Sequence, residues 1–387
     1  MRTRTSVTAA MAAVALVSAA CGSTDGGGAT GVSESTIKIG ITNALSGPGG
    51  SVCAPFTEAS SAYFDMVNDD GGVAGHQIDY QVLDDAYDAT RAVANMRELM
   101  SEDMFAFVGG CGTIQAAPLA PALTKSKIPY LFPYAGLREL VDPVSPYVYG
   151  LLPLYEDQIK ALVPYAFEEK GAGSVYMAAN EWPGYDDAID NAKAATEQGG
   201  GTFLDSQVTK LGTADYTPVA LAIKDAQPDY LIIDQGGADA VKLVDALVAQ
   251  GALPKKGILG VSTLTTGVFL ESHNTAADPL LYIASPVRLP AEPDSACAKA
   301  LEAAGLAQDG ATVFGCAQAE LFVRAVEAAD DLTRDGLLQA LNQMTVEETA
   351  VLPEVAFTED DHMGVDSVYV QTLDRRKLTT VATSPIE

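Results

Sequence analysis

Basic residues are scarce in this chain of 387 residues. Lysine and arginine together number 23 against 51 aspartate and glutamate residues, which gives a formal net charge of −28 at pH 7. A chain this acidic repels nucleic acid and anionic lipid surfaces, so we expect neither as a partner. Histidine is scarcer still, and His76, His273 and His362 stand far apart in polar segments. We therefore expect the histidines at the surface and predict no metal site.

Further absences exclude further classes of protein. After residue 20, no run reaches the roughly 18 consecutive apolar residues that a membrane helix needs. The chain has no nucleophile elbow, no pair of histidines and no cluster of metal ligands, which argues against an exported enzyme and gives no catalytic residue. A dinucleotide fingerprint would need a third glycine after Gly110 and Gly112, where the chain has Gln115. No cofactor is therefore predicted.

The N-terminus has the pattern of an export signal. Arg2 and Arg4 form a short basic region, and the apolar run that follows is too short to span a bilayer. This run ends in VSAAC, which resembles a bacterial lipobox and predicts a lipid anchor on Cys21, with ordinary secretory cleavage as the alternative. Residues 1–20 are then a lipoprotein signal peptide, and 21–35, rich in Gly, Ser and Thr, a flexible tether. We expect the mature protein outside the cytoplasm, held to the cell membrane through its lipid alone.

Cysteines beyond the predicted lipid site are few and even in number. They are Cys53, Cys111, Cys297 and Cys316. In an oxidising compartment an even number indicates disulfides, here two of them. Four cysteines allow three connectivities, and composition alone leaves the choice among them open.

The most informative stretch runs from Phe105 to Leu123, with the sequence FAFVGGCGTIQAAPLAPAL. Apolar residues run into Gly109 and Gly110, and an Ala/Leu-rich segment follows. This order predicts a buried strand, a glycine turn and a helix with Thr113 as N-cap or first-turn residue. Ligands of open parallel sheets bind at such turns, and a helix N-terminus attracts anions. A capped helix without any ligand is the alternative interpretation.

Strands and helices alternate along the remaining chain. This alternation predicts an α/β fold with parallel sheets covered on both faces, in two tandem units. Helices are expected between the strands, the first from about Pro55 to Asn68 and later ones from about Ser295 and Val313. The expected strands are Ile37–Asn43, Ile78–Leu83, Phe105–Val108, Ile128–Phe132, Ser174–Ala179, Phe203–Val208, Tyr230–Asp234, Gly257–Val261, Val355–Phe357 and Val368–Leu373.

Several motifs in a fixed order carry a family resemblance. They are IKIGITNALSGPGG, VNDDGGVAGHQIDYQVLDDAYDATRAVANMRELM, FVGG, SKIPYLFPYA and TADYTPVALAIKDAQPDYLIID. This series resembles the bacterial extracytoplasmic solute-binding proteins of the leucine/isoleucine/valine-binding type, which deliver ligand to the permease subunits of an ABC importer. The resemblance implies the type 1 periplasmic-binding-protein fold: two Rossmann-like lobes with parallel sheets, which trap a small-molecule ligand between them.

The resemblance also implies where the two lobes meet along the chain. It predicts three crossovers, at about Tyr147–Pro153, Ala284–Leu289 and Glu347–Pro353. The first lobe then comprises 36–150 plus 288–348, and the second 151–287 plus 349–387.

Ligand residues of the first lobe can be carried over by position. The amino-acid binders hold the α-carboxylate with a hydroxyl four residues after the strand-end glycine, and here Thr113 matches it. A backbone contact comes from the residue after the proline of the next strand, here Tyr134. Two residues further, the family's threonine is replaced by Gly136. Gly112 and Ala135, beside the two matching positions, complete the predicted contacts of this lobe.

The second lobe departs from the pattern of the amino-acid binders. The family's acidic residue, which pairs with the α-ammonium group, is replaced by Ser262 and Thr263. Its aromatic residue after strand 230–233 is replaced by Gly236. Trp182 stands where an aromatic residue of this lobe usually covers the ligand, and its neighbours are loop-forming, so we expect it in an exposed position of the cleft. Tyr155 adds a second flat surface.

A buried ammonium group without a carboxylate partner would cost several kcal/mol. Ser262 cannot supply that charge, although Glu181, Asp234 or Asp239 could substitute from neighbouring loops. The residues therefore favour a neutral, amide-like or carboxylate-bearing apolar ligand over a branched-chain amino acid. A ligand-sensing regulatory lipoprotein of the same fold is the alternative to a transport receptor.

The fold that the resemblance implies also selects the disulfide pairing. With the usual strand order 2-1-3-4-5, the loops after the first and third strands are neighbours at the cleft. Cys53 follows the first strand and Cys111 the third, which predicts the pairs Cys53–Cys111 and Cys297–Cys316.

Overall fold

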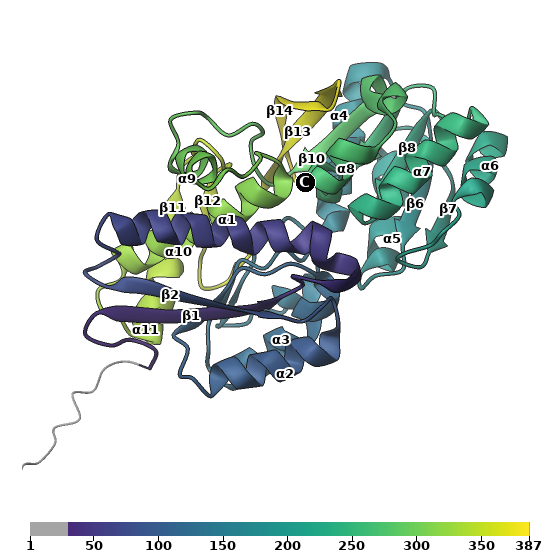
Figure 1. Cartoon of the computed structure of the whole chain (residues 1–387). Helices are drawn as coiled ribbons and strands as arrows, with labels where there is room; N and C mark the ends of the chain where they lie inside the picture. Colours follow the sequence, from purple (N-terminus) through teal and green to yellow (C-terminus); the bar gives the residue numbers. More distant parts are fainter. Residues whose placement is uncertain (1–29, 387) are drawn as a thin grey trace, which may run out of the picture.

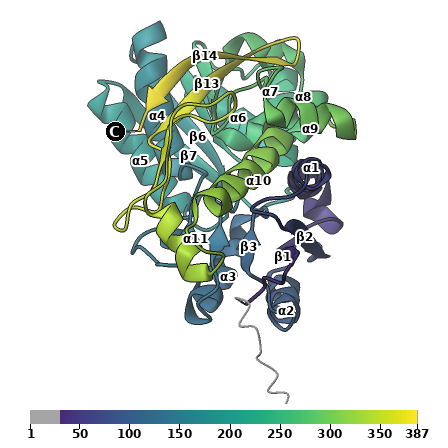
Figure 2. The same ribbon diagram turned by 90° about the vertical axis from the view of Figure 1, so that its left-hand side faces the viewer.

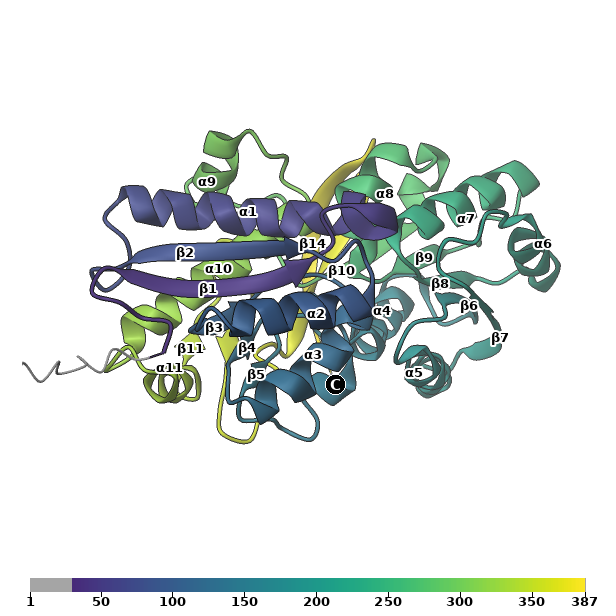
Figure 3. The ribbon, with the colours of Figure 1, turned by 60° about the horizontal axis from the view of Figure 1, so that its bottom comes forward.

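Five parallel strands form the first sheet of the computed structural model, which describes residues 30–386 (Figure 1). Their order is β2-β1-β3-β4-β5, as predicted. Figure 3 shows α1 on one side of β1 and β2, and α2 with α3 on the other. This double cover explains why β3 is apolar at every position. The elements are β1 (Thr36–Asn43), α1 (Gly50–Asp69), β2 (Gln77–Asp84), α2 (Ala89–Met100), β3 (Ala106–Val108), α3 (Thr113–Lys125), β4 (Tyr130–Leu131) and β5 (Val148–Tyr149).

Seven strands form the second sheet, in the order β14-β13-β10-β9-β8-β6-β7. The five strands from β6 to β10 pair in parallel, whereas β13 and β14 join in antiparallel pairs. The elements before the last two strands are α4 (Tyr155–Lys170), β6 (Ser174–Asn180), α5 (Tyr185–Gln198), β7 (Thr202–Thr209), α6 (Thr217–Ala226), β8 (Tyr230–Asp234), α7 (Gly237–Gln250), β9 (Gly257–Gly260), α8 (Gly267–Ser272) and β10 (Leu281–Ser285).

The C-terminal part of the chain contributes helices to the first lobe and strands to the second. Helices α9 and α10 pack beside α1 of the first lobe, and β13 and β14 extend the second sheet (Figure 2). Ser295 is the N-cap of α9, as predicted, whereas α10 begins before Val313 at a capping box of Asp309 and Thr312. The elements are α9 (Ala296–Ala304), α10 (Gly310–Ala328), α11 (Arg334–Leu341), β11 (Thr345–Val346), β12 (Val355–Ala356), β13 (Ser367–Asp374) and β14 (Lys377–Pro385).

The chain thus forms an α/β fold with two lobes, as predicted. The exact boundaries of the lobes stay a prediction, and contacts near the last crossover favour one change. Phe357 stacks on Phe132 with ring centroids 5.8 Å apart, and Met363 bridges to Gly150. Phe132 follows β4 and Gly150 follows β5, so both partners lie at the ends of strands of the first sheet. We therefore propose that the last crossover follows Met363, later than 347–353.

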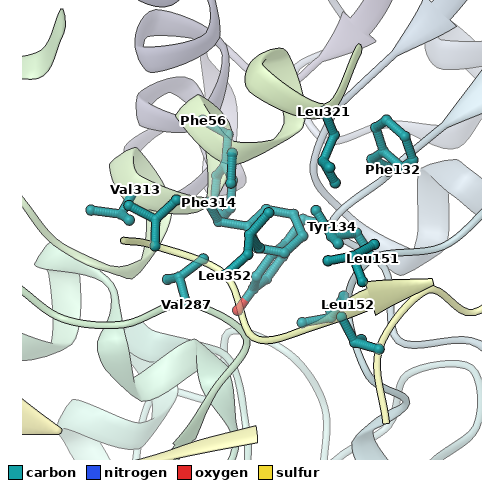
Figure 4. Packing of buried hydrophobic residues seen from close by; sticks show 14 of the residues in the cluster. Phe56, Phe132, Tyr134, Leu151, Leu152, Val287, Val313, Phe314, Leu321 and Leu352 are labelled. Carbon is teal, nitrogen blue, oxygen red and sulfur yellow. The ribbon is translucent and has the colours of Figure 1, made fainter. Parts of the chain in front are cut away.

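The core of the first lobe depends on a close approach of α1 and α10. A Cβ atom on Gly315 would lie 2.1 Å from the carbonyl oxygen of Phe56, so only glycine fits there. The Ser60 hydroxyl donates to the Gly315 carbonyl at 2.7 Å. Phe56 and Phe314 pack against the Tyr134 ring, with centroids 4.5 and 5.1 Å away (Figure 4). This packing places α10 directly behind Tyr134.

Both predicted disulfides are confirmed. Cys53 pairs with Cys111, with Cα atoms 5.4 Å apart, and Cys297 pairs with Cys316. The start of α1 was placed too late, because the helix begins at Gly50 and contains Pro55. Cys53 therefore lies in the second turn of α1 rather than in a loop.

The expectation of surface histidines is wrong for His273 and His362, which are 0% and 2% exposed. The His273 ring stacks on Phe269, and its Nε2 lies 2.6 Å from a carboxylate oxygen of Asp278. The His362 ring stacks on Tyr149, and burial lowers the pKa of His362. The partners of His273 lie four and five residues away in the chain, whereas those of His362 are distant in the sequence.

The signal peptide and Cys21 lie outside the described residues. Residues 30–35, assigned to the tether, already contact the fold, since the amide of Lys38 donates to the Gly31 carbonyl at 2.8 Å. No helix within 30–386 has the length and apolar composition to cross a membrane.

Candidate functional site

A cavity of about 320 Å³ lies where the carboxyl ends of the two sheets face each other. Its wall combines turns and helix starts from both lobes. Of the eight predicted ligand residues, six line this cavity: Gly112, Thr113, Tyr134, Tyr155, Trp182 and Gly236. The structure thus brings together residues that lie far apart in the sequence. That they bind a ligand stays a prediction.

Three helices begin at the cavity wall. The N-caps of α1, α3 and α7 are Gly49, Gly112 and Gly236, and none of them has a side-chain cap. Amide groups in the first turn of a helix have no partner within the helix, and the helix dipole adds partial positive charge there. The helices are 20, 13 and 14 residues long. A 3-10 turn, Gly47–Gly49, leads directly into α1, and its Gly47 carbonyl accepts from the Gly50 amide. The cavity therefore faces the amide donors of two open helix starts, those of α3 and α7.

The turn before α3 depends on glycine. Gly112 has a φ of 117°, a backbone conformation that residues other than glycine rarely adopt. A Cβ atom there would also lie 2.2 Å from Oε1 of Gln115. Gly112 is the N-cap and Thr113 the first helical residue, which confirms the predicted first-turn position. Thr113 is 5% exposed and presents its hydroxyl at the start of the helix.

Asn43, at the end of β1, ties the two helix starts of the first lobe together. Its Nδ2 donates to the Cys53 carbonyl at 2.8 Å, and its Oδ1 accepts from the Cys111 amide at 3.0 Å. The disulfide between these cysteines joins the same two segments. The starts of α1 and α3 are thus fixed relative to each other. Sequence reasoning missed Asn43, although a polar residue at the end of a buried strand was a usable signal.

Two aromatic rings form part of the second lobe's wall. Tyr155 and Trp182 stack with centroids 5.1 Å apart and an interplanar angle of 16°. Trp182 lines the cavity as expected, but it is only 8% exposed because Tyr155 covers one face. Burial raises the pKa of Tyr155 well above its usual range, so its hydroxyl stays neutral. Leu211 adds an apolar contact on this side, and Val52 and Ile114 add apolar contacts from the first lobe.

Ser262 and Ala135 are not part of the cavity wall. The Tyr134 hydroxyl donates to Ser262 Oγ at 2.9 Å, and the Ser262 amide donates to Gln158 Oε1 at 2.8 Å. Ser262 therefore links the two lobes and has no group directed at the cavity. Burial raises the pKa of Tyr134, which keeps the donating hydroxyl protonated. Ala135 is buried in the core of the first lobe.

The three acidic residues that could replace the ammonium partner are placed differently. Asp239 lines the cavity, but its carboxylate accepts from the Gly212 amide at 2.8 Å and from Lys242 Nζ at 3.1 Å. Asp234 is buried behind Trp182 and has no contact with the cavity. Glu181 is exposed and outside the wall. Within the described part of the chain, no group of acidic, histidine or cysteine side chains is suited to a metal ion.

Comparison with known proteins identifies the family of the fold. A family model described as "Periplasmic binding protein" matches residues 36–377. No curated protein sequence matches the chain.

Three solved structures are similar over nearly their full length. One is a fatty acid ABC transporter substrate-binding protein from Thermomonospora curvata, with 23% identity and a TM-score of 0.80 over 93% of this chain and 95% of that one. A second is a branched chain amino acid ABC transporter from Thermus thermophilus with bound valine, with 18% identity and a TM-score of 0.82 over 92% and 98%. A third is a solute binding protein of an ABC transporter from Rhodopseudomonas palustris BisB5 in complex with 3,4-dihydroxy benzoic acid, with 19% identity and a TM-score of 0.77 over 91% and 98%. At these identities, the likeness shows the fold alone.

Proposed function

The chain belongs to the periplasmic binding protein family, and we propose that it is a receptor outside the cytoplasm that traps a small molecule between its lobes for an ABC importer. The three similar structures are named as parts of ABC transporters, which supports a permease as partner. Anchoring through a lipid on Cys21 is part of the proposal and rests on the lipobox-like sequence alone.

The choice of ligand rests on one observation: helix starts without side-chain caps meet at an apolar cavity. The start of α3 in the first lobe and that of α7 in the second offer amide donors and partial positive charge to the cavity. Each such terminus favours an anion by about 0.3–1 kcal/mol, and by up to about 2 kcal/mol when partly buried. Aromatic and aliphatic side chains form much of the remaining wall. The ligand that fits is an apolar molecule with one carboxylate.

A free branched-chain amino acid fits less well, because its ammonium group would lack a partner. The Asp239 carboxylate already accepts from Lys242, the Gly212 amide and the Asn180 side chain, and Asp234 lies behind Trp182. An unpaired ammonium group in this cavity would cost several kcal/mol. The similar proteins named for fatty acid and solved with 3,4-dihydroxy benzoic acid are consistent with a carboxylate on an apolar body.

The first experiment identifies the ligand. Small molecules released from the purified protein by denaturation are identified by mass spectrometry, and candidates are tested by thermal shift beside leucine, isoleucine and valine. A ligand at 100 times its Kd stabilises the fold by about 2.7 kcal/mol, which raises the melting temperature measurably. A rise with an apolar carboxylate and none with the three amino acids supports the proposal. Tight binding of leucine would overturn the assignment of the ligand.

Variants on one helix test the site. Thr113→Val should weaken binding by about 1–3 kcal/mol through a lost hydrogen bond. Thr124→Val removes a hydroxyl at the far end of α3, outside the cavity, and serves as the matched control. Equal affinity in both variants would contradict the role of Thr113. Uptake of the identified ligand by cells with and without the gene separates transport from sensing.

A further inference from the structure

A buried acid stands directly behind the tryptophan of the cavity wall. Asp234 ends β8 and is 0% exposed. Its Oδ2 accepts from the indole Nε1 of Trp182 at 3.4 Å, and its Oδ1 has no hydrogen-bond partner among the described residues. A buried carboxyl with one unpaired oxygen is rare in proteins, because each unpaired polar group costs about 1–3 kcal/mol.

Trp182 connects Asp234 to the cavity through a hydrogen bond. The indole lines the cavity, whereas Asp234 does not. One neighbour of the ring is Tyr155, which stacks on it, and another is Gly236, whose Cβ position would lie 4.0 Å from Cζ3. A small shift of the indole therefore changes the cavity wall directly. The absence of a side chain at Gly236 leaves room for such a shift.

We propose that Asp234 is a positioning residue for Trp182: its ionised form draws the indole N–H toward β8, and its protonated form lets the ring relax toward the cavity. The pH of the surroundings then sets the shape of the second lobe's wall. This inference rests on the proposed function in so far as the cavity is the ligand site.

The distance and the ionisation behaviour both support a titrating contact. Charge-assisted hydrogen bonds to carboxylates are usually about 2.7–2.9 Å long, so the 3.4 Å contact can shorten on ionisation. Burial raises the pKa of Asp234 to about 7, the Trp182 hydrogen bond opposes this rise, and the charge of Glu156 adds to it. Both protonation states are therefore populated near neutral pH.

Helix α4 contributes the nearest titratable groups. Tyr155 packs on Trp182, and its pKa is raised by burial, so it stays neutral throughout the pH range of interest. Burial also raises the pKa of Glu156, against the effect of Arg138, whose Nη2 lies 2.8 Å from Glu156 Oε1. Glu156 is therefore the one nearby acid on α4 that could be mistaken for Asp234 in a titration.

The other elements around Asp234 contribute less. Helix α7 carries Asp239 and Lys242, which form an ion pair with each other at 3.1 Å. On the neighbouring strand β6, the register partner of Asp234 is Ala179, and β9 ends at Gly260, so neither strand end adds a charge. Among the described residues, no cationic side chain contributes to the pKa of Asp234.

The chain contains one tryptophan, which makes the test specific to this position. The unliganded protein is titrated from about pH 5 to about pH 9 while tryptophan fluorescence and the single indole N–H signal in a ¹H–¹⁵N spectrum are recorded. Both signals are expected to change with one midpoint near pH 7. An indole signal that stays constant over this range would overturn the proposal.

Two isosteric variants assign the midpoint. Asp234→Asn should abolish the transition, whereas Glu156→Gln should keep it and lower its midpoint, because a neighbouring negative charge is lost. A transition that persists in Asp234→Asn, or that disappears in Glu156→Gln, means that another group titrates and the proposal is wrong. If Asp234→Asn does not fold, the midpoint of the transition in Glu156→Gln is the deciding measurement. A midpoint equal to that of the wild type would mean that Asp234 is not the titrating group.

These measurements need no ligand. They can therefore succeed or fail independently of the proposed function. A transition at Trp182 in a protein that binds no carboxylate would leave the positioning role intact and refute only the assignment of the ligand.

Discussion

Removal of either disulfide should destabilise the protein, but only one removal should impair the cleft. Cys53–Cys111 closes a segment with a sequence separation of 58, and Cys297–Cys316 one of 19. The chain-entropy relation gives about 4 kcal/mol for the first and about 3 kcal/mol for the second. The two double Cys→Ala variants are thus matched perturbations of similar size.

The expected difference lies in binding. Cys53 and Cys111 line the cavity and join the starts of α1 and α3, whereas Cys297 and Cys316 join α9 to α10 and are not part of the wall. After loss of the first disulfide, the hydrogen bonds of Asn43 remain, but the covalent link between the two helix starts is gone. We expect affinity to fall in that variant and to stay near the wild-type value in the other.

Urea unfolding measures the stabilities, and calorimetry with the identified ligand measures the affinities. Equal affinity losses in both double variants would show that general destabilisation weakens binding. Full affinity without the Cys53–Cys111 disulfide would refute the argument that the disulfide shapes the site. The order of the two stability losses tests the loop-length reasoning separately.

Three further outcomes are expected. Cys21→Ala should move the protein from the membrane fraction to the soluble fraction, and a variant that still sediments with membranes would place the anchor elsewhere. Gly236→Phe should fill the cavity and weaken binding at least about tenfold, and unchanged affinity by calorimetry would contradict this. The fold should persist, because Gly236 has an ordinary φ of −59° and its Cβ position lies 3.2 Å from Leu211 and 4.0 Å from Trp182. Because burial raises the pKa of Asp234 from its usual value of 3.8 to about 7, the folded state keeps this proton to higher pH than the unfolded state does. Stability from this group should therefore fall by about 4 kcal/mol as pH rises from about 4 to about 7, and urea unfolding of Asp234→Asn should lack this fall.

The parts of the fold that follow local rules could be predicted from the sequence. Strand β3 and the helix start at Thr113 were recognisable because an apolar run, a glycine turn and a helix-forming segment follow one another. The Cys53–Cys111 pair needed the strand order that the family resemblance implied, since neighbouring parallel strands bring their carboxyl ends together. For the same reason, most of the predicted ligand residues reached one cavity.

Several differences from the sequence-based expectations involve partners that lie far away in the chain. Ser262 was expected to face the ligand, but Tyr134, 128 residues earlier, reaches across the cleft to it. His362 was assigned to the surface, but it hydrogen-bonds to the Val148 carbonyl, 214 residues earlier. The unpaired carboxyl of Asp234 could be seen only once Trp182 had been placed over it. No local pattern encodes such contacts, because they depend on how segments distant in the sequence pack together.

The contact between Ser60 and Gly315 spans 255 positions and has a consequence for biosynthesis. The chain emerges from the ribosome and from the export machinery in order, so α1 must wait for α10 until nearly the whole chain is outside. The strands β6 to β10 can assemble in the meantime from adjacent segments. The lobe made first is thus completed last, and its apolar α1 face stays available to chaperones and proteases during that interval.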